Sequence, residues 1–434
     1  MSYDGFFRWI RLFVLTAITM LLALAGCQPR QVISPPFSPV RVQHLEREPI
    51  VRVRILTREG TIMITGPRQV TVGPTHEGGT GTQSRIFSTP LSINREVGRF
   101  ILRPQQGQVI GWALPCLVVQ GVSAPEIAIS GRTYPGAIWL HPHNENKRVE
   151  KNIDAVNHVK LETYLPGVLE GELFGDWHAT TFAAQSIAAR SYAITTLAQS
   201  RDRHYDLEST TASQVYTGHA SNRRAITAVR QTRGQVLTYN KQVVRAYYSS
   251  CCGGTGQEAA VAFPAGPRIV PLQGREHGPW CKASKYFRWG PIHRDKTTLA
   301  TRLTDWGQQN NNVIARLRGL RNIVIAARNR VGRPAAFTVI DARGRKFNMT
   351  AEQLRFAANH DGPGLPSVLA KKKLRSSHVQ VKAIGRSLVF YDGRGFGHGV
   401  GMCQYGAQGL ALKGYNVATI LNFFYRDAAI RRFY

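Results

Sequence analysis

Glycine occupies every second position from Gly393 to Gly401, in the run Gly-Arg-Gly-Phe-Gly-His-Gly-Val-Gly. Because glycine has no Cβ, this density indicates backbone in unusual φ/ψ regions or backbone that another group approaches closely. The spacing partly matches glycine-rich nucleotide loops, but those loops open a βαβ unit that is followed by an acidic residue. No such unit is evident around this run. We therefore discount a nucleotide site in this run.

The strongest helical signal lies between Glu162 and Gln199. Pro166 falls near the start of a first short helix, where its missing N–H costs little. A second helix is predicted over roughly residues 179–198. Gln185 and Tyr192 lie on a different face from its apolar residues, so Gln185 can point away from the core.

Short alternating apolar and polar runs on both sides of this helical pair predict strands. They centre on residues 51–55, 61–65, 69–72, 109–113, 137–140, 235–239, 243–248, 323–327, 336–342 and 379–391. A further helix is predicted over 407–425. The pattern indicates an α+β fold, with mixed or antiparallel sheets around the short helical pair and an N-terminal β-rich module over residues 49–130.

The N-terminus has the features of an export signal. A basic flank with Arg8 and Arg11 precedes an apolar stretch over residues 12–25, which is short for a membrane span. The ending Leu-Ala-Gly-Cys27 resembles the bacterial lipobox, which predicts removal of residues 1–26 and lipidation of Cys27. An ordinary signal peptide or a short anchor helix is the alternative. We predict a protein exported to the cell envelope, lipid-anchored at the periplasmic or outer-membrane face, with a proline-rich tether over residues 27–48.

The chain carries 56 Lys and Arg against 26 Asp and Glu, a formal net charge of +30. Such an excess is typical of nucleic-acid binding, but export argues against that partner. An exported cationic protein meets anionic wall polymers or lipid headgroups. A solvated surface that keeps the protein soluble explains the charge equally well.

Three groups of segments resemble the SpoIID/LytB family, and they occur in the family's order over roughly residues 130–434. They are residues 162–173 with 184–193, residues 213–218 with 246–255, and residues 393–406 with 421–425. The sporulation members of this family are peptidoglycan lytic transglycosylases. The resemblance therefore implies a catalytic domain over residues 131–434 that acts on peptidoglycan glycan strands.

The resemblance implies that Glu172 is the catalytic acid. A lytic transglycosylase cleaves without adding water, so one carboxyl group can suffice where hydrolases need two. Burial would raise the pKa of this carboxyl, and its apolar neighbours could supply that burial: Val168, Leu169, Leu173 and Phe174. Glu170 is the nearest competitor, but residues two apart on a helix lie on nearly opposite faces.

Six further residues match family positions, which implies substrate binding: Gln185, Arg190, Tyr192, His398, Gln404 and Tyr405. Arg190 could instead be an ion-pair partner, and Tyr192 a core aromatic residue. His398 would bind sugar hydroxyls or orient Glu172, and its alternative is a histidine packed in a turn.

The chain has six cysteines, and lipidation of Cys27 leaves an odd number, which excludes a full disulfide framework. Some family members are associated with zinc, and a site formed by Cys252, His277, Cys281 and Cys251 has suitable soft ligands. A Cys252–Cys281 disulfide fits an oxidising compartment equally well. Cys403 stands where many family members have serine, and we interpret it as a packing residue.

A second function remains open from the resemblance. LytB-type relatives are regarded as enhancers of an amidase, so the chain could bind wall glycan and a partner enzyme without cleaving. The glutamate at position 172 favours an enzyme over this alternative.

Overall fold

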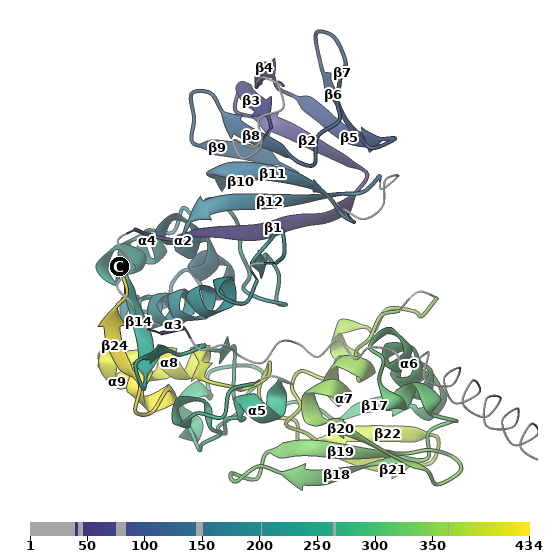
Figure 1. The fold of residues 1–434 in the computed structure, drawn as a ribbon. Coiled ribbons are helices and arrows are strands. Elements are labelled where there is room, and N and C mark those ends of the chain that lie inside the picture. Colours follow the sequence, from purple (N-terminus) through teal and green to yellow (C-terminus); the bar gives the residue numbers. More distant parts are fainter. Residues whose placement is uncertain are drawn as a thin grey trace, which may run out of the picture. The chain divides into compact units, whose positions relative to one another are not determined.

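The computed structural model describes residues 40–41, 47–74, 84–144, 151–200, 202–263, 266–362 and 364–434. All of them belong to one compact unit, residues 37–434. The predicted signal segment and Cys27 lie outside the described residues. Within the described part of the chain, no helix combines the length and apolar character needed to cross a membrane. The fold is α+β, which confirms the predicted class (Figure 1).

A seven-stranded sheet contains the first strand of the described chain. Its order is β13 (Leu207–Glu208), β1 (Ile50–Glu59), β12 (Ile153–Lys160), β11 (Ala137–Pro142), β8 (Leu117–Gly121), β3 (Gln69–Gly73) and β4 (Arg85–Ser88). Neighbouring strands are antiparallel except β1 and β13. In β1, Val51, Val53 and Ile55 are buried and alternate with more accessible residues, as the sequence periodicity predicts.

A six-stranded antiparallel sheet completes this β-rich region. Its order is β10 (Arg132–Pro135), β9 (Glu126–Ile129), β2 (Thr61–Gly66), β5 (Leu91–Glu96), β6 (Arg99–Pro104) and β7 (Ile110–Trp112). The boundary that we placed at residue 130 falls within the β9–β10 hairpin. The β-rich region continues to Lys160, where β12 leads directly into the first helix of the predicted pair.

The two predicted helices are α2 (Leu161–Glu172) and α3 (Ala179–Leu197). Every residue of α3 from Thr181 to Thr196 is buried, so it has no single apolar face. A helix that is buried on all sides lies in the centre of a core. Its neighbours are α2, α4 (Arg223–Gln231), α8 (Gln404–Ala411), α9 (Val417–Phe424) and the sheet strand β14 (Gln235–Tyr239).

Both ends of the described chain contact this helical core. Strand β14 pairs with β15 (Gln242–Val243) and with the C-terminal strand β24 (Ala429–Arg432). Within the segment predicted as a tether, the Val40 carbonyl accepts a hydrogen bond from Val243 N at 2.8 Å, and Glu48 pairs with Arg233 at 2.7 Å.

Residues 292–391 form a module with its own hydrophobic core, which includes Leu303, Phe337, Leu354 and Phe390. We call it the inserted module, because it lies between Cys281 and the glycine-rich run. Its two sheets are β17 (Ile292–Asp295), β22 (Ser387–Tyr391) and β21 (Gln380–Ile384), and β18 (Asn322–Arg328), β19 (Pro334–Ile340) and β20 (Lys346–Thr350). Its helices are α6 (Lys296–Gln309), α7 (Ala351–Ala358), η3 (Val313–Arg316) and η4 (Ala370–Lys372).

The glycine-rich run packs along the segment 247–257. Strand β16 (Tyr248–Ser249) pairs in parallel with β23 (Met402–Cys403), and Cys251 bridges to Phe396. A Cβ at Gly395 (φ +80°) would lie 2.4 Å from the Cys251 carbonyl oxygen, and one at Gly401 (φ +66°) 2.0 Å from that of Tyr247. The group that approaches these two glycines closely is another stretch of backbone. Three short helices complete the elements of the described residues: α5 (Ala259–Ala262), η1 (Val270–Leu272) and η2 (Gly278–Cys281).

Candidate active site

Glu172 ends helix α2, and two segments distant in sequence hold its carboxylate. Oε1 accepts a hydrogen bond from Val215 N at 2.8 Å, and Oε2 accepts one from Gln404 Nε2 at 3.2 Å. Burial raises the pKa of Glu172, and these two hydrogen bonds only partly oppose that effect. The carboxyl group therefore keeps its proton to a higher pH than a free glutamate does.

Tyr164, Gln214 and Tyr248 form a hydrogen-bonded group close enough to Glu172 for its charge to act on both phenols. Tyr164 O–H donates to Gln214 Oε1 at 3.3 Å, and Gln214 Nε2 donates to Tyr248 Oη at 2.9 Å. Burial raises the pKa of both phenols, and the charge of Glu172 adds to the effect. The phenols therefore stay neutral. None of these three side chains supplies a positive charge that would balance an ionised Glu172.

Sequence reasoning missed the roles of Gln214 and Val215. Both lie in the segment 213–218, which carries part of the family resemblance, so the segment itself was the available signal. Val215 acts through its backbone N–H. Any residue except proline has this group, so the residue type does not reveal the role.

Glu170 points to a different part of the structure. Its carboxylate accepts hydrogen bonds from Ser221 N at 2.8 Å and from Asn222 N at 3.1 Å, just before α4. An acceptor there satisfies backbone N–H groups near a helix start. Glu170 and Glu172 thus have separate partners, as expected for residues two apart on one helix.

Phe174, Trp177 and Tyr405 form an aromatic cluster whose members closely follow Glu172 and Gln404 in the sequence. Ring centroids are 5.4 Å apart for Phe174–Trp177, 4.9 Å for Trp177–Tyr405 and 6.1 Å for Phe174–Tyr405. Phe174 follows Glu172 by two residues, and Tyr405 follows Gln404, which contacts Glu172. The Phe174 side chain is 57% exposed and presents an apolar surface to solvent, whereas Leu173 is buried.

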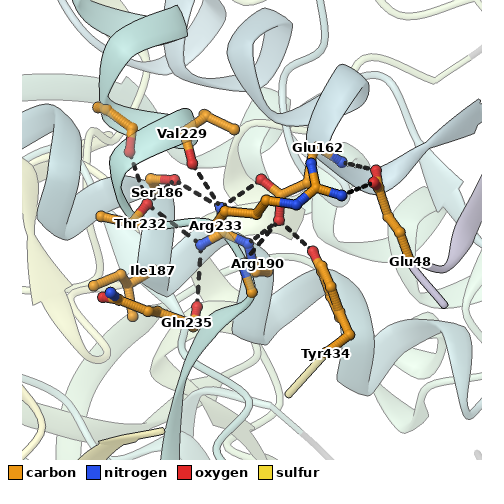
Figure 2. Close-up of polar contacts among 12 residues, drawn as sticks. Glu48, Glu162, Ser186, Ile187, Arg190, Val229, Thr232, Arg233, Gln235 and Tyr434 are labelled. Atoms are coloured by element: carbon orange, nitrogen blue, oxygen red, sulfur yellow. Dashed lines mark hydrogen bonds and ion pairs between the residues drawn. The ribbon is translucent and has the colours of Figure 1, made fainter. Parts of the chain in front are cut away.

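Arg190 occupies the ion-pair position that the sequence left open as its alternative. Figure 2 shows its guanidinium directed at Glu162 of α2. Its Nε and Nη2 donate to the two Glu162 oxygens at 2.9 and 2.8 Å, and Nη1 donates to the Gln235 carbonyl at 3.0 Å. The guanidinium is fully buried. Through these hydrogen bonds it connects α3 to α2 and to β14.

Glu162 receives further hydrogen bonds in this network. Gly234 N donates to Oε1 at 3.1 Å, and the Tyr434 hydroxyl donates to the same oxygen (Figure 2). Burial alone would raise the pKa of Glu162, but the hydrogen bonds and charge of Arg190 outweigh it, and the pKa is lowered. Glu162 is therefore an ionised anchor for the helix that carries Glu172.

Gln185 and Tyr192 also lie inside the helical core. Gln185 is fully buried, and among the described residues its amide oxygen and nitrogen have no hydrogen-bond partner. The ring of Tyr192 lies 5.8 Å from that of Tyr247 and 6.5 Å from that of Tyr248. Their predicted contact with substrate stays a prediction.

His398 is held by its own loop. Its Nδ1 accepts a hydrogen bond from Val400 N at 3.0 Å, and its ring lies 5.1 Å from that of Phe263. Burial lowers the pKa of His398 to about 4, so the imidazole is neutral at neutral pH. The contact from this part of the chain to Glu172 comes from Gln404.

Four cysteines converge near the start of α8. Cys251, Cys252, Cys281 and Cys403 are buried and are free thiols. The sulfurs of Cys251, Cys281 and Cys403 lie within 4.8 Å of one another, and Cys252 Sγ lies 3.7 Å from Cys281 Sγ. We call these four residues the thiol cluster. It contains three of the predicted metal ligands together with Cys403, which we had interpreted as a packing residue.

Comparisons with known proteins agree with these features. Residues 149–239, which contain Glu172 and Arg190, match the family model of the stage II sporulation protein SpoIID. An uncharacterised protein of Brachyspira hyodysenteriae is 27% identical over 304 residues, covering 70% of this chain and 73% of that protein. Stage II sporulation protein D of Bacillus amyloliquefaciens is 26% identical over 347 residues, covering 73% and 91%.

The amidase enhancer of Bacillus subtilis is 25% identical over 283 residues, covering 60% of this chain but only 39% of that protein. With the matches above, it indicates a protein with a role related to the cell wall. The family model over residues 149–239 and these relatives support the resemblance of the chain to the SpoIID/LytB family.

Proposed function

We propose that this chain is a peptidoglycan lytic transglycosylase with Glu172 as its general acid and base. It would cleave the β-1,4 bond between MurNAc and GlcNAc and leave 1,6-anhydro-MurNAc ends. The observation that carries the proposal is the state of Glu172. Its carboxyl group has a raised pKa and two N–H donors that favour its ionised form.

The proposed reaction uses both protonation states of Glu172. The protonated carboxyl gives its proton to the glycosidic oxygen as the bond from that oxygen to C1 of MurNAc breaks. The resulting carboxylate takes the proton from the C6 hydroxyl of the same sugar, whose oxygen forms the new bond to C1. Burial favours the first state, while Val215 N and Gln404 Nε2 stabilise the carboxylate formed between the two steps.

The aromatic cluster supports a carbohydrate substrate. Sugar rings carry apolar C–H faces that pack on aromatic side chains, and such rings add apolar contact at low entropy cost. Phe174 is exposed and follows Glu172 by two residues, and Tyr405 directly follows Gln404. We assign this cluster to one of the sugars that flank the cleaved bond. The predicted roles of Gln185, Arg190, Tyr192 and His398 in substrate binding are separate predictions.

We also propose that the protein acts in the cell envelope, tethered by lipid on Cys27, with no nucleic-acid partner. The net charge of +30 would then favour approach to anionic wall polymers or headgroups. Metabolic labelling with a fatty-acid analogue would test this, because Cys27→Ser should abolish the label. Labelling that persists in Cys27→Ser would contradict the lipid anchor.

The product assay tests the chemistry. The purified full-length chain is incubated with glycan strands, and the products are identified by mass spectrometry. We expect 1,6-anhydro ends, and Glu172→Gln should lose activity by orders of magnitude while remaining folded. Glu170→Gln is the matched control, because Glu170 contacts Ser221 and Asn222, and it should stay active. Hydrolysed reducing ends, or unchanged turnover in Glu172→Gln, would overturn the mechanism.

A second candidate function is that of a glycan-binding protein that enhances an amidase. The similarity to the Bacillus subtilis amidase enhancer favours it, and the aromatic cluster, of which Phe174 is exposed, could bind glycan without any cleavage. In that case the wild-type chain would release no glycan fragments, and Glu172→Gln would retain glycan affinity. Stimulation of a purified cell-wall amidase by both proteins would support this candidate over the transglycosylase.

A further inference from the structure

Three segments that are distant in sequence line a cavity of about 560 Å³. They are the segment 270–276, the turn between β18 and β19 at residues 330–331, and Phe423, Arg426 and Asp427 at the end of α9 and just after it. The last of these overlaps the segment 421–425, to which the proposed reaction assigns no role. Cavities of roughly 300–1,000 Å³ hold small organic ligands. The size of this cavity therefore suits such a ligand better than a single ion.

Each of the three segments contributes one arginine to the cavity: Arg275, Arg330 and Arg426. The three guanidinium groups lie close enough for the charges of Arg426 and Arg330 to act on Arg275. Burial lowers the pKa of Arg275, the two like charges add to this effect, and the carboxylate of Asp427 only partly opposes them. Like charges in one cavity repel each other. An anion bound among the three arginines would therefore relieve an existing repulsion.

Two of these guanidinium groups are held by backbone around the cavity and still have donors for a ligand. Arg330 Nε donates to the Gly274 carbonyl at 2.7 Å, and Arg275 Nη2 donates to the Val270 carbonyl at 3.2 Å. Among the described residues, the buried Nε of Arg275 has no hydrogen-bond partner. Because a guanidinium carries several N–H donors in a planar fork, these contacts orient the two groups without using up their donors.

Asn329 fixes the turn that carries Arg330 to the segment that carries Arg275. Its Nδ2 donates to the Gly256 carbonyl at 3.1 Å and to Gln257 Oε1 at 3.0 Å. Gly256 N in turn donates to the Arg275 carbonyl at 2.7 Å. Both arginines are therefore positioned by the same short stretch of backbone. A site that is already assembled in this way loses less entropy when it binds a ligand.

The other lining residues suit the hydroxyl groups and the C–H face of a polyol or sugar. Glu276 and Asp427 are exposed, and their carboxylates can accept hydrogen bonds from hydroxyl groups. Phe423 is half-buried and supplies an aromatic ring. His277, which the sequence placed among the candidate metal ligands, is buried and lies against this ring, with ring centroids 5.9 Å apart. The cavity thus combines cations, hydrogen-bond acceptors and an apolar surface.

Three guanidinium groups suit a phosphate better than a carboxylate. One arginine fork pairs with both oxygens of a carboxylate, whereas the tetrahedral oxygens of a phosphate accept hydrogen bonds from several directions. We propose that Arg275, Arg330 and Arg426 bind the phosphate group of a phosphorylated polyol or sugar, as it occurs in anionic polymers of the cell envelope. The choice of an envelope polymer rests on the proposed location of the protein. The phosphate site depends neither on that location nor on Glu172.

Isothermal titration calorimetry of the purified full-length chain at low ionic strength tests the site, with glycerol 3-phosphate as the probe. We expect this probe to bind more tightly than inorganic phosphate, because it adds hydroxyl and C–H contacts, and about tenfold or more tightly than acetate. Acetate binding as tight as that of the probe would refute the phosphate assignment, and equal affinities for the two phosphates would refute the polyol contacts. Glu172→Gln should bind the probe like the wild type, so the outcome is independent of the proposed reaction.

A matched pair of variants separates the cavity from the general excess of positive charge. Arg426→Gln should weaken binding of glycerol 3-phosphate by about tenfold or more, as expected for the loss of a charge-assisted hydrogen bond. Arg343→Gln is the control, because Arg343 is exposed in the turn between β19 and β20 and its loss changes the net charge equally. Both side chains are exposed, so both variants should fold. Equal effects of the two substitutions would overturn the site.

A competition assay identifies the source of the phosphate. The Cys27→Ser chain is used, so that the proposed lipid anchor does not attach the protein to membranes. Soluble poly(glycerol phosphate) should displace glycerol 3-phosphate, as followed by phosphorus NMR of the probe. Phosphatidylglycerol vesicles should not displace it, because the exposed carboxylates of Glu276 and Asp427 would face the negative bilayer surface. Displacement by vesicles alone, or by neither, would refute the envelope polymer as the source of the ligand.

Discussion

Replacing Glu162 with glutamine should destabilise the protein strongly, because the substitution leaves the buried Arg190 guanidinium without its counterion. Arg190 is fully buried, and the Glu162 side chain is 8% exposed. Removing one partner of a buried ion pair costs about 3–5 kcal/mol, since the remaining charge is uncompensated. Glutamine keeps one carbonyl acceptor for Gly234 N and the Tyr434 hydroxyl, so we expect the lower end, about 3 kcal/mol.

Chemical denaturation at pH 7 measures this loss, with hydrogen exchange of the α3 amides as a local probe. The chain has two hydrophobic cores, so a local probe separates loss of the helical core from unfolding of the inserted module. Glu96→Gln is the matched control, because Glu96 and Arg103 form an ion pair in which both side chains are more than 40% exposed. Such exposed pairs are screened by solvent and contribute little to stability.

The loss of stability in Glu162→Gln should depend on pH. The pKa of Glu162 is lowered in the folded protein from its ordinary value of 4.5. A lowered folded pKa contributes stability above the unfolded pKa and loses it as pH falls through the folded pKa. The stability gap between wild type and Glu162→Gln should therefore shrink below about pH 4.5. A gap under about 1 kcal/mol at pH 7, or a gap that is the same at pH 7 and pH 3, would refute the reasoning.

Two further predictions concern catalysis. Gln404→Met removes a hydrogen bond that lowers the pKa of Glu172, so that pKa should rise further. The alkaline limb of the kcat/KM profile should therefore move to higher pH, and kcat should fall. A move of this limb to lower pH would contradict the prediction. Trp177→Ala removes two ring contacts from the aromatic cluster and should raise KM for glycan fragments roughly 3- to 10-fold, from the ~0.5–1.5 kcal/mol of an aromatic contact. Phe356→Ala, an exposed aromatic on the inserted module, should leave KM unchanged.

Local periodicity predicted those parts of the fold in which one face of an element is buried. The strand at residues 51–55 is one such case, because its apolar residues alternate in burial. The segment 379–391 was predicted as one strand, but it is a hairpin that turns at Gly385, where φ is +52°. Helix α3 was predicted close to its observed bounds, but burial on all sides leaves no single apolar face from which its contacts could be inferred.

The sequence could indicate Glu172 and Gln404 only through the segments that carry the family resemblance. Neither residue is unusual by itself, and their contact spans 232 positions. The family resemblance did not decide the role of Arg190. A match to a family position is expected both for a residue that binds substrate and for one that forms a structural ion pair. Only the position of Glu162 opposite its guanidinium distinguishes the two. The sequence likewise did not indicate that Cys403 lies close to Cys251 and Cys281 in the structure.

The adjacency of Cys403 and Gln404 makes the thiol cluster relevant to the reaction. Cys403 accepts the Gly406 N–H at the start of α8, and the next residue holds the Glu172 carboxylate. If the cluster positions Gln404, Cys403→Ser should shift the alkaline limb in the same direction as Gln404→Met. The double variant should then show no further shift, because both substitutions act through the same hydrogen bond from Gln404 to Glu172. Independent effects would instead add, and additive shifts would restrict the cluster to stabilising the fold.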